Sequence, residues 1–122
     1  MSVFSDIYTM LNVTSINDLV DDISPYVRGR KKDFPAVLIE VPSTSFDRLS
    51  SGVYRRINEV ELSCIARSVA EAETVAEAVL TVLGSENCVA LDSLSREYEE
   101  GYDEDSVGLF IVTIQLQLFS GA

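Results

Sequence analysis

Hydrophobic and polar residues alternate most regularly within residues 53–66. One set of alternate positions is apolar: Val60, Leu62, Cys64 and Ala66. The positions between them are polar: Glu59, Glu61 and Ser63. Because successive side chains of a strand point to opposite faces, this pattern predicts a long strand with one apolar and one polar face.

The C-terminal segment 107–119 alternates in the same way. One face is apolar throughout: Phe110, Val112, Ile114, Leu116 and Leu118. The other face begins with Leu109 and Ile111 and then becomes polar. Three further strands are predicted. Residues 34–41 form an almost unbroken apolar run, residues 88–98 alternate more weakly, and residues 23–27 form a short edge strand because Pro25 has no backbone donor.

Two helices are predicted on either side of the first long strands. Residues 68–83 carry an apolar stripe at helical spacing, opened by an S-x-x-E capping box at Ser68 and Glu71. Gly84 is predicted to end this helix in a left-handed conformation. Residues 2–11 repeat apolar residues at helical spacing, and residues 12–22 are expected to be a loop or a short turn of helix.

These elements predict an α+β fold in a single domain, residues 1–122. Segments 34–41 and 53–66 pair as a hairpin across a polar loop, 43–52, and segments 88–98 and 107–119 pair across an acidic tip, 99–106. The expected order is α-β-β-α-β-β, with a mainly antiparallel sheet and two helices on one face. This connectivity is a circular permutation of the ferredoxin-like order.

The charge balance narrows the possible partners. The 122 residues carry a net charge of −11, which disfavours nonspecific binding to nucleic acid. An acidic wall would still let DNA slide past without adhering. Cys64 and Cys88 form no CxxC motif, so we expect two reduced, buried cysteines in a cytosolic protein. No signal peptide and no membrane span is expected.

Candidate chemistry is sparse, because the chain has no histidine to act as a general base. Six of the nine residues 97–105 are acidic. They could form a solvated hairpin tip, bind a divalent cation or contact a basic partner. The basic cluster within 28–32 could be a charged turn, cradle a phosphate or form ion pairs between subunits. Arg55 and Arg56, beside Tyr54, could stack on a nucleotide or lie in an interface.

We therefore expect no enzymatic activity, no catalytic residue, no metal site and no cofactor. The candidates for contacts with other subunits are the charged residues of these segments: Arg28, Arg30, Lys31, Lys32, Arg48, Arg55, Arg56, Glu99, Glu100, Asp103, Glu104 and Asp105. The polar face of the long strands also carries Ile65, Leu109 and Ile111. Apolar residues on a face that the helices leave uncovered favour oligomerisation.

The order of features resembles the tail-terminator and tail-completion proteins of long-tailed bacteriophages. The resemblance covers residues 2–120 and rests on a short N-terminal helix, the segment FPAVLIEV, a long polar loop, and a strand ending VELSCIAR. It continues through the helix AEAETVAEAVLTVL and two closing strands that end in VGLFIVTIQLQLF. These are local patterns in a shared layout and not a fingerprint motif.

The resemblance implies a structural protein of the virion tail or neck, assembled in the host cytoplasm. Such proteins form a ring, commonly a homohexamer, that caps the head-proximal end of the tail tube. The ring stops tube polymerisation and joins the tail to the head connector, and DNA passes through its lumen without specific binding. Two alternatives stay open: a neck adaptor between head and tail, and a small ferredoxin-like ligand-binding domain. A tail-tube gene directly downstream would favour the terminator over the neck adaptor. A multimer in size exclusion would favour a ring, whereas a ligand-binding domain would elute as a monomer or dimer.

Overall fold

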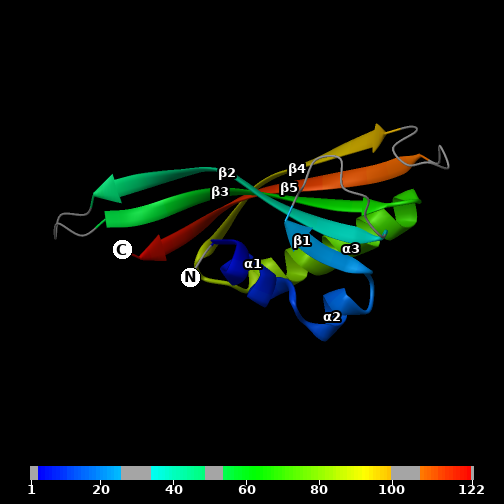
Figure 1. The fold of residues 1–122 in the computed structure, drawn as a ribbon, viewed down its shortest axis with the longest axis horizontal. Helices are drawn as coiled ribbons and strands as arrows, with labels where there is room; N and C mark the ends of the chain where they lie inside the picture. The colour runs from blue at the N-terminus through cyan, green and yellow to red at the C-terminus, as the bar shows by residue number, and fades with distance from the viewer. Residues whose placement is uncertain (1–2, 26–33, 49–53, 100–107, 122) are drawn as a thin grey trace.

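The protein folds as one five-stranded sheet with helices packed on one side (Figure 1). The computed structural model describes residues 3–25, 34–48, 54–99 and 108–121. In chain order the elements are α1 (Val3–Leu11), α2 (Thr14–Asn17), β1 (Asp22–Pro25), β2 (Ala36–Arg48), β3 (Tyr54–Ala66), α3 (Val69–Gly84), β4 (Val89–Glu99) and β5 (Leu109–Gly121). The α+β class is confirmed. The predicted order α-β-β-α-β-β is incomplete, because α2 and β1 lie between the first helix and the first hairpin.

The strands lie side by side in the order β1-β2-β3-β5-β4. The two predicted hairpins are present: β2 pairs antiparallel with β3, and β4 pairs antiparallel with β5. The two halves of the sheet join where β3 pairs antiparallel with β5 along almost its full length. The edge strand β1 is also confirmed, and its pairing with β2 is parallel, over Asp22–Pro25 and Ala36–Ile39.

Strand β2 is longer than its sequence pattern predicts. Residues 43–48 were expected to be loop, but they continue β2 and pair with residues 54–59 of β3. The pairing shifts between Glu40 and Ser43, so that Val41 and Pro42 together lie opposite Val60. Such a bulge accommodates a proline at a sheet edge and changes which residues face each side. The sequence pattern does not reveal the continuing strand, because the bulge interrupts the alternation of apolar and polar residues where the apolar run ends.

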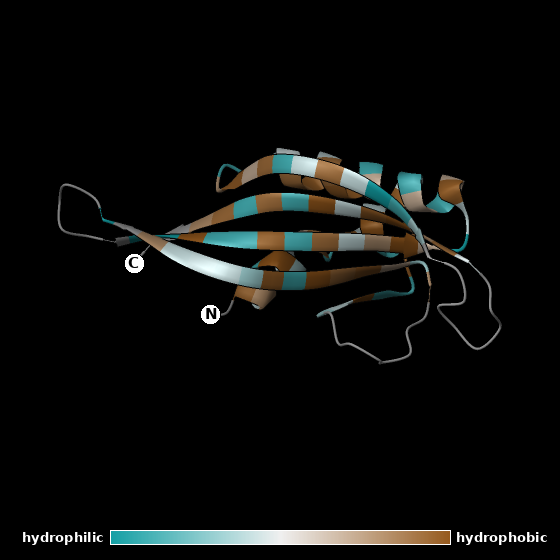
Figure 2. Ribbon diagram, turned by 90° about the horizontal axis from the view of Figure 1, so that it is seen from above, coloured by the Kyte–Doolittle hydropathy of each residue, from teal (hydrophilic) through white to brown (hydrophobic). Residues whose placement is uncertain are grey.

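The main core lies between the sheet and the helices. The apolar faces predicted for β3 and β5 both enter it, and Val60, Leu62, Cys64 and Leu116 are at most 1% exposed. Helix α3 contributes Ala72, Val75, Ala76, Val79 and Leu83, and helix α1 contributes Ile7 and Leu11. Figure 2 shows the resulting alternation as hydrophobic and hydrophilic bands across the strands, with the helices behind the sheet.

Helix α3 begins as predicted and ends differently. The Ser68 side chain is the N-cap and accepts a hydrogen bond from the backbone N–H of Glu71 at 3.2 Å. At the other end, Gly84 is still helical and Ser85 is the C-cap, in a right-handed conformation. The N–H groups of Ser85 and Glu86 bond to the carbonyls of Val82 and Leu83. The helix closes with this tightened turn, so the predicted left-handed glycine was wrong.

A second, smaller apolar cluster lies on the helix-free face of the sheet. Its buried members are Ala36, Leu38, Ile65 and Leu109, and Phe34 and Ile111 pack against them. Ile65 and Leu109 were expected to be exposed on this face, but they are 3% and 0% exposed. Cross-strand neighbours from β2, β3 and β5 meet at this end of the sheet and pack together.

Candidate functional site

One end of the sheet projects beyond the helices as a three-stranded arm (Figure 1). The arm consists of residues 43–48 of β2, 54–57 of β3 and 119–121 of β5. Its strands are joined by regular antiparallel pairs such as Phe46 with Arg56 and Ile57 with Phe119. No helix in the described part of the chain covers either face of it. Because strands gain stability from packing on one face, this uncovered extension is a candidate contact surface.

A buried asparagine fastens the arm to the body of the sheet. Asn58 is 0% exposed and is the buried polar residue among the described positions. Its Nδ2 donates to the carbonyl oxygen of Leu118 at 3.0 Å, and its Oδ1 accepts from the Thr44 hydroxyl at 2.8 Å. Since a buried amide costs free energy unless it is paired, these bonds fix the three strands relative to one another where the arm begins.

The described charged side chains of the arm are basic, and its aromatic side chains lie beneath them. The Arg56 guanidinium lies 5.9 Å from the ring centroid of Phe46, and the Arg55 guanidinium lies 5.2 Å from that of Phe119. Phe46 is 64% exposed, more than any other large apolar residue of the described chain. Cation–π contacts hold both arginines over apolar surface and keep their charge in solvent.

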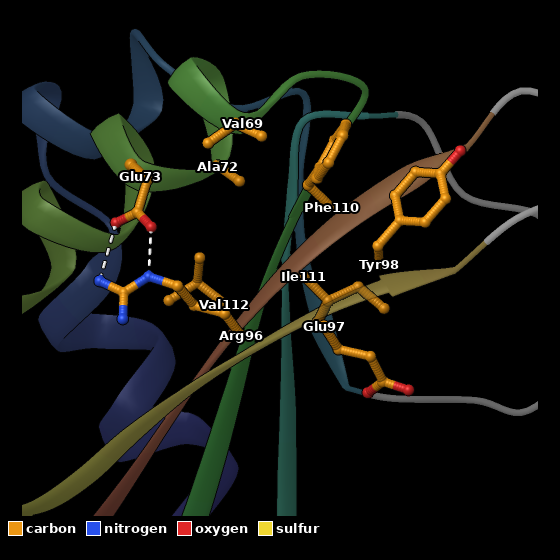
Figure 3. Close-up of a pocket in the computed structure, with 9 residues that line it drawn as sticks. All are labelled: Val69, Ala72, Glu73, Arg96, Glu97, Tyr98, Phe110, Ile111 and Val112. Carbon is orange, nitrogen blue, oxygen red and sulfur yellow. Dashed lines mark hydrogen bonds and ion pairs between the residues drawn. The ribbon is translucent and has the colours of Figure 1, made fainter.

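A pocket of about 240 Å³ lies at the opposite end of the molecule, between the start of α3 and strands β4 and β5 (Figure 3). Its apolar lining comes mainly from Val69 and Ala72 of α3 and from Phe110 and Val112 of β5. Tyr98 of β4 closes one side, with its ring centroid 4.9 Å from that of Phe110. Val69 and Tyr98 are each 54% exposed. The pocket is smaller than the ~300 Å³ typical of sites for drug-sized ligands, and it suits a single side chain.

An ion pair borders this pocket. Arg96 Nε donates to one carboxylate oxygen of Glu73, and Arg96 Nη2 donates to the other at 3.3 Å. The hydrogen bond from Arg96 and its charge lower the pKa of Glu73, and the same carboxylate raises the pKa of Arg96. Both side chains are substantially exposed, so solvent screens the pair and it adds little to stability. Its effect is to hold the two charged groups at fixed positions beside the pocket.

The helix-free face carries a polar ladder in its middle. Gln117 Nε2 donates to Glu59 Oε1 at 3.0 Å, and Gln115 Nε2 donates to Glu61 Oε1 at 3.3 Å. The Ser93 hydroxyl donates to Gln115 Oε1 at 2.9 Å. Glu59 and Glu61 are thus each held by a glutamine from the adjacent strand. This arrangement forms an acidic surface on the helix-free face.

The two cysteines lie in different surroundings. Cys64 is fully buried in the main core, and burial raises the pKa of its thiol to about 12. A thiol in this state is not nucleophilic. Cys88 is only partly buried, so the expectation that both are buried holds for Cys64 alone. Neither is in a disulfide.

Few of the predicted interface residues fall within the described chain. Arg48, Arg55 and Arg56 are exposed and gather on the arm, and Glu99 is the last residue of β4. The remaining candidates lie outside the described residues: Arg28, Arg30, Lys31, Lys32, Glu100, Asp103, Glu104 and Asp105. The sequence reasoning missed Phe46 and the pocket. The available signal for Phe46 was an aromatic residue in a serine-rich segment. The pocket has no such signal, because its lining comes from three segments that are distant in the sequence.

Within the described residues, no group of three or more Asp, Glu, Cys or His side chains is placed to hold a metal ion. None of the helices described there has the length and hydropathy needed to cross a bilayer.

Comparison with known proteins gives a likeness in fold. No protein-family model matches the sequence, and no curated protein is similar to it in sequence. Among solved structures, the chain is similar to a protein of the virion of a native gene transfer agent particle, with a TM-score of 0.69. The likeness covers 99% of this chain and 96% of that chain at 13% identity. The two chains share their fold over nearly their whole length.

Proposed function

We propose that this protein is a structural component of a virion and acts as a tail terminator. The observation that carries the proposal is the likeness in fold, over nearly the full length of both chains, to a protein of a gene transfer agent virion. The layout of the sequence supports the tail-terminator role independently, through its resemblance to the tail-terminator proteins of long-tailed phages. In this role the protein caps the head-proximal end of the tail tube as a closed ring of about six copies.

The surfaces of the molecule suit such a role. The arm offers exposed aromatic and basic side chains with no helix behind them, as a contact element requires. The sheet face with Glu59 and Glu61 is acidic, and a chain with a net charge of −11 repels a phosphate backbone. A ring lined by such surfaces would let DNA pass without binding it. The partners would be further copies of this chain, the tail tube protein and the head connector.

Deletion of the gene from the phage or phage-like element that encodes it tests this function. Electron microscopy of the resulting particles should show overlong tails that are separate from heads, because tube growth no longer stops. Supply of the intact gene in trans should restore tail length and joining. Tails of normal length that fail to join heads would instead support the neck adaptor. Particles of normal form and yield would overturn both assignments.

A further inference from the structure

The arm lies at one end of the longest axis of the molecule, and the start of α3 and the end of β4, which line the pocket, lie at the other (Figure 1). Phe46 projects from one end and is 64% exposed. The pocket at the other end is apolar and of a size suited to one side chain (Figure 3). A knob and a complementary pocket on different parts of one chain produce head-to-tail contacts, which form rings when the rotation closes.

The charges of the two ends are opposite. Arg48, Arg55 and Arg56 lie on the arm, where Asp47 is the single acidic residue, in a chain that has only nine basic residues. The pocket lining carries Glu73 and Glu97 against Arg96. Helix α3, which forms its rim, has three acidic residues and no basic one. Copies with a net charge of −11 repel one another overall. A local contact between a basic surface and an acidic surface offsets this repulsion and orients the two copies.

We propose that the arm of one copy binds the pocket of the next, with Phe46 inserted between Val69 and Tyr98, and with Arg48 and Arg56, which share the face of Phe46, over the acidic rim. This inference rests on the proposed ring and names the contact that builds it. The contact is heterologous, so each copy uses its arm toward one neighbour and its pocket toward the other. An aromatic anchor in a desolvated pocket, ringed by complementary charges, is the usual form of an interface hot spot.

Two single variants separate the two halves of this contact. Phe46→Ser removes the knob and leaves the pocket intact. Val69→Lys places a positive charge at the pocket mouth and leaves the arm intact. Both residues are more than half exposed, so both variants should fold, as circular dichroism and thermal melting will show. Leu91→Ser is the matched control, because Leu91 is 45% exposed and belongs to neither the arm nor the pocket.

Light scattering after size exclusion, over a range of protein concentrations, measures the result. We expect the intact protein and Leu91→Ser to form multimers, and each of the two contact variants to dissociate at concentrations about tenfold higher or more. An equimolar mixture of Phe46→Ser and Val69→Lys should give dimers and nothing larger. The arm of the second variant can bind the pocket of the first, and the remaining arm and pocket are both disabled.

Contact variants that form the same multimers as the intact protein would overturn this inference and leave the proposed function standing. Failure of the mixture to form dimers would also overturn it. If the variants keep their multimeric state but no longer join tails, the arm binds a different virion protein and the contact between copies is wrong. An intact protein that is monomeric at every concentration would refute the contact, and the gene-deletion experiment would then decide the proposed function separately.

Discussion

The phenol ring of Tyr98 packs over the Cα of Gly108, in the space that a side chain at position 108 would occupy. Tyr98 also lies directly opposite Phe110 across the β4–β5 pair, with the rings tilted by 44°. Glycine at position 108 thus lets an aromatic side chain cover the strand backbone where β5 begins. The position of Tyr98 in turn shapes one side of the pocket.

Gly108→Val should therefore push Tyr98 off the sheet. We expect a loss of about 1–2 kcal/mol of unfolding free energy, because the ring is half exposed and can move aside at moderate cost. Chemical denaturation of four proteins measures it: intact, Gly108→Val, Tyr98→Ala and the double variant. If the two residues interact as described, the valine should cost less in the Tyr98→Ala background. Equal costs in both backgrounds would contradict the packing.

The sequence predicts those elements of the fold whose information is local. Val60 to Ala66 alternate because one face of β3 is buried along its length, and period-two alternation follows directly from strand geometry. The start of α3 is predictable because its cap joins Ser68 to a residue only three positions away. The burial of Cys64 follows from the same alternation.

Features that depend on distant partners were not predictable. Residues 43–48 lack alternation of apolar and polar residues, and they are extended because β3 pairs with them beyond a bulge. The parallel pairing of β1 depends on the position of β2, about a dozen residues later. The end of α3 depended on whether Ser85 continued the helical turn, which Gly84 alone does not determine.

The candidate site also has parts that the sequence predicts and parts that it does not. Arg55 and Arg56 could be selected from the sequence, because charged residues beside a hairpin tip are exposed. Their position over Phe46 and Phe119 could not, since it depends on the register of three strands. The pocket unites α3 with β4 and β5, and no short segment of sequence carries a sign of it.

Leu83→Ala tests the packing of α3 on the sheet. Leu83 is 0% exposed in the main core, so truncation should cost about 2–5 kcal/mol and lower the melting temperature by roughly 10 °C. Thr81→Ala on the same helix is the control, because Thr81 is exposed and its hydroxyl bonds only to the Glu77 carbonyl one turn earlier. A silent Leu83→Ala would mean that this face of α3 does not pack on the sheet.

Ser68→Ala tests the helix cap. Removal of the hydroxyl leaves the N–H of Glu71 without its acceptor and should cost about 1 kcal/mol. Ser68→Asp is the matched control, since its carboxylate can accept the same hydrogen bond near the positive end of the helix dipole. Urea denaturation should place Ser68→Asp close to the intact protein. An Asp variant as unstable as the Ala variant would show that the hydroxyl acts in some other way.

Glu73→Gln tests the ion pair beside the pocket. Arg96 lowers the pKa of Glu73, so the pair stabilises the fold above the ordinary carboxyl pKa. That contribution disappears as pH falls through the lowered value, where the folded protein takes up the proton. We expect the intact protein to lose more stability than Glu73→Gln over this acidic range at low salt. High salt should narrow the difference, because both groups are exposed. Identical pH dependence of the two proteins would contradict the pairing.

Cys64 gives a prediction at the other end of the pH scale. Burial raises the pKa of its thiol from 9.0 to about 12, so the unfolded chain releases this proton at lower pH than the folded protein. The stability that the neutral thiol contributes is present below pH 9.0 and declines as the pH rises toward about 12. Cys64→Ala should be less stable at neutral pH, because it leaves a cavity, but its stability should fall less steeply across this range. Other groups titrate there too, so the difference in slope between the two proteins is the measurement.

In the native state at pH 8, a thiol reagent should modify Cys88 well before Cys64, and denaturant should equalise the two rates of modification. Equally fast native modification of both thiols would mean that the core around Cys64 is open to solvent.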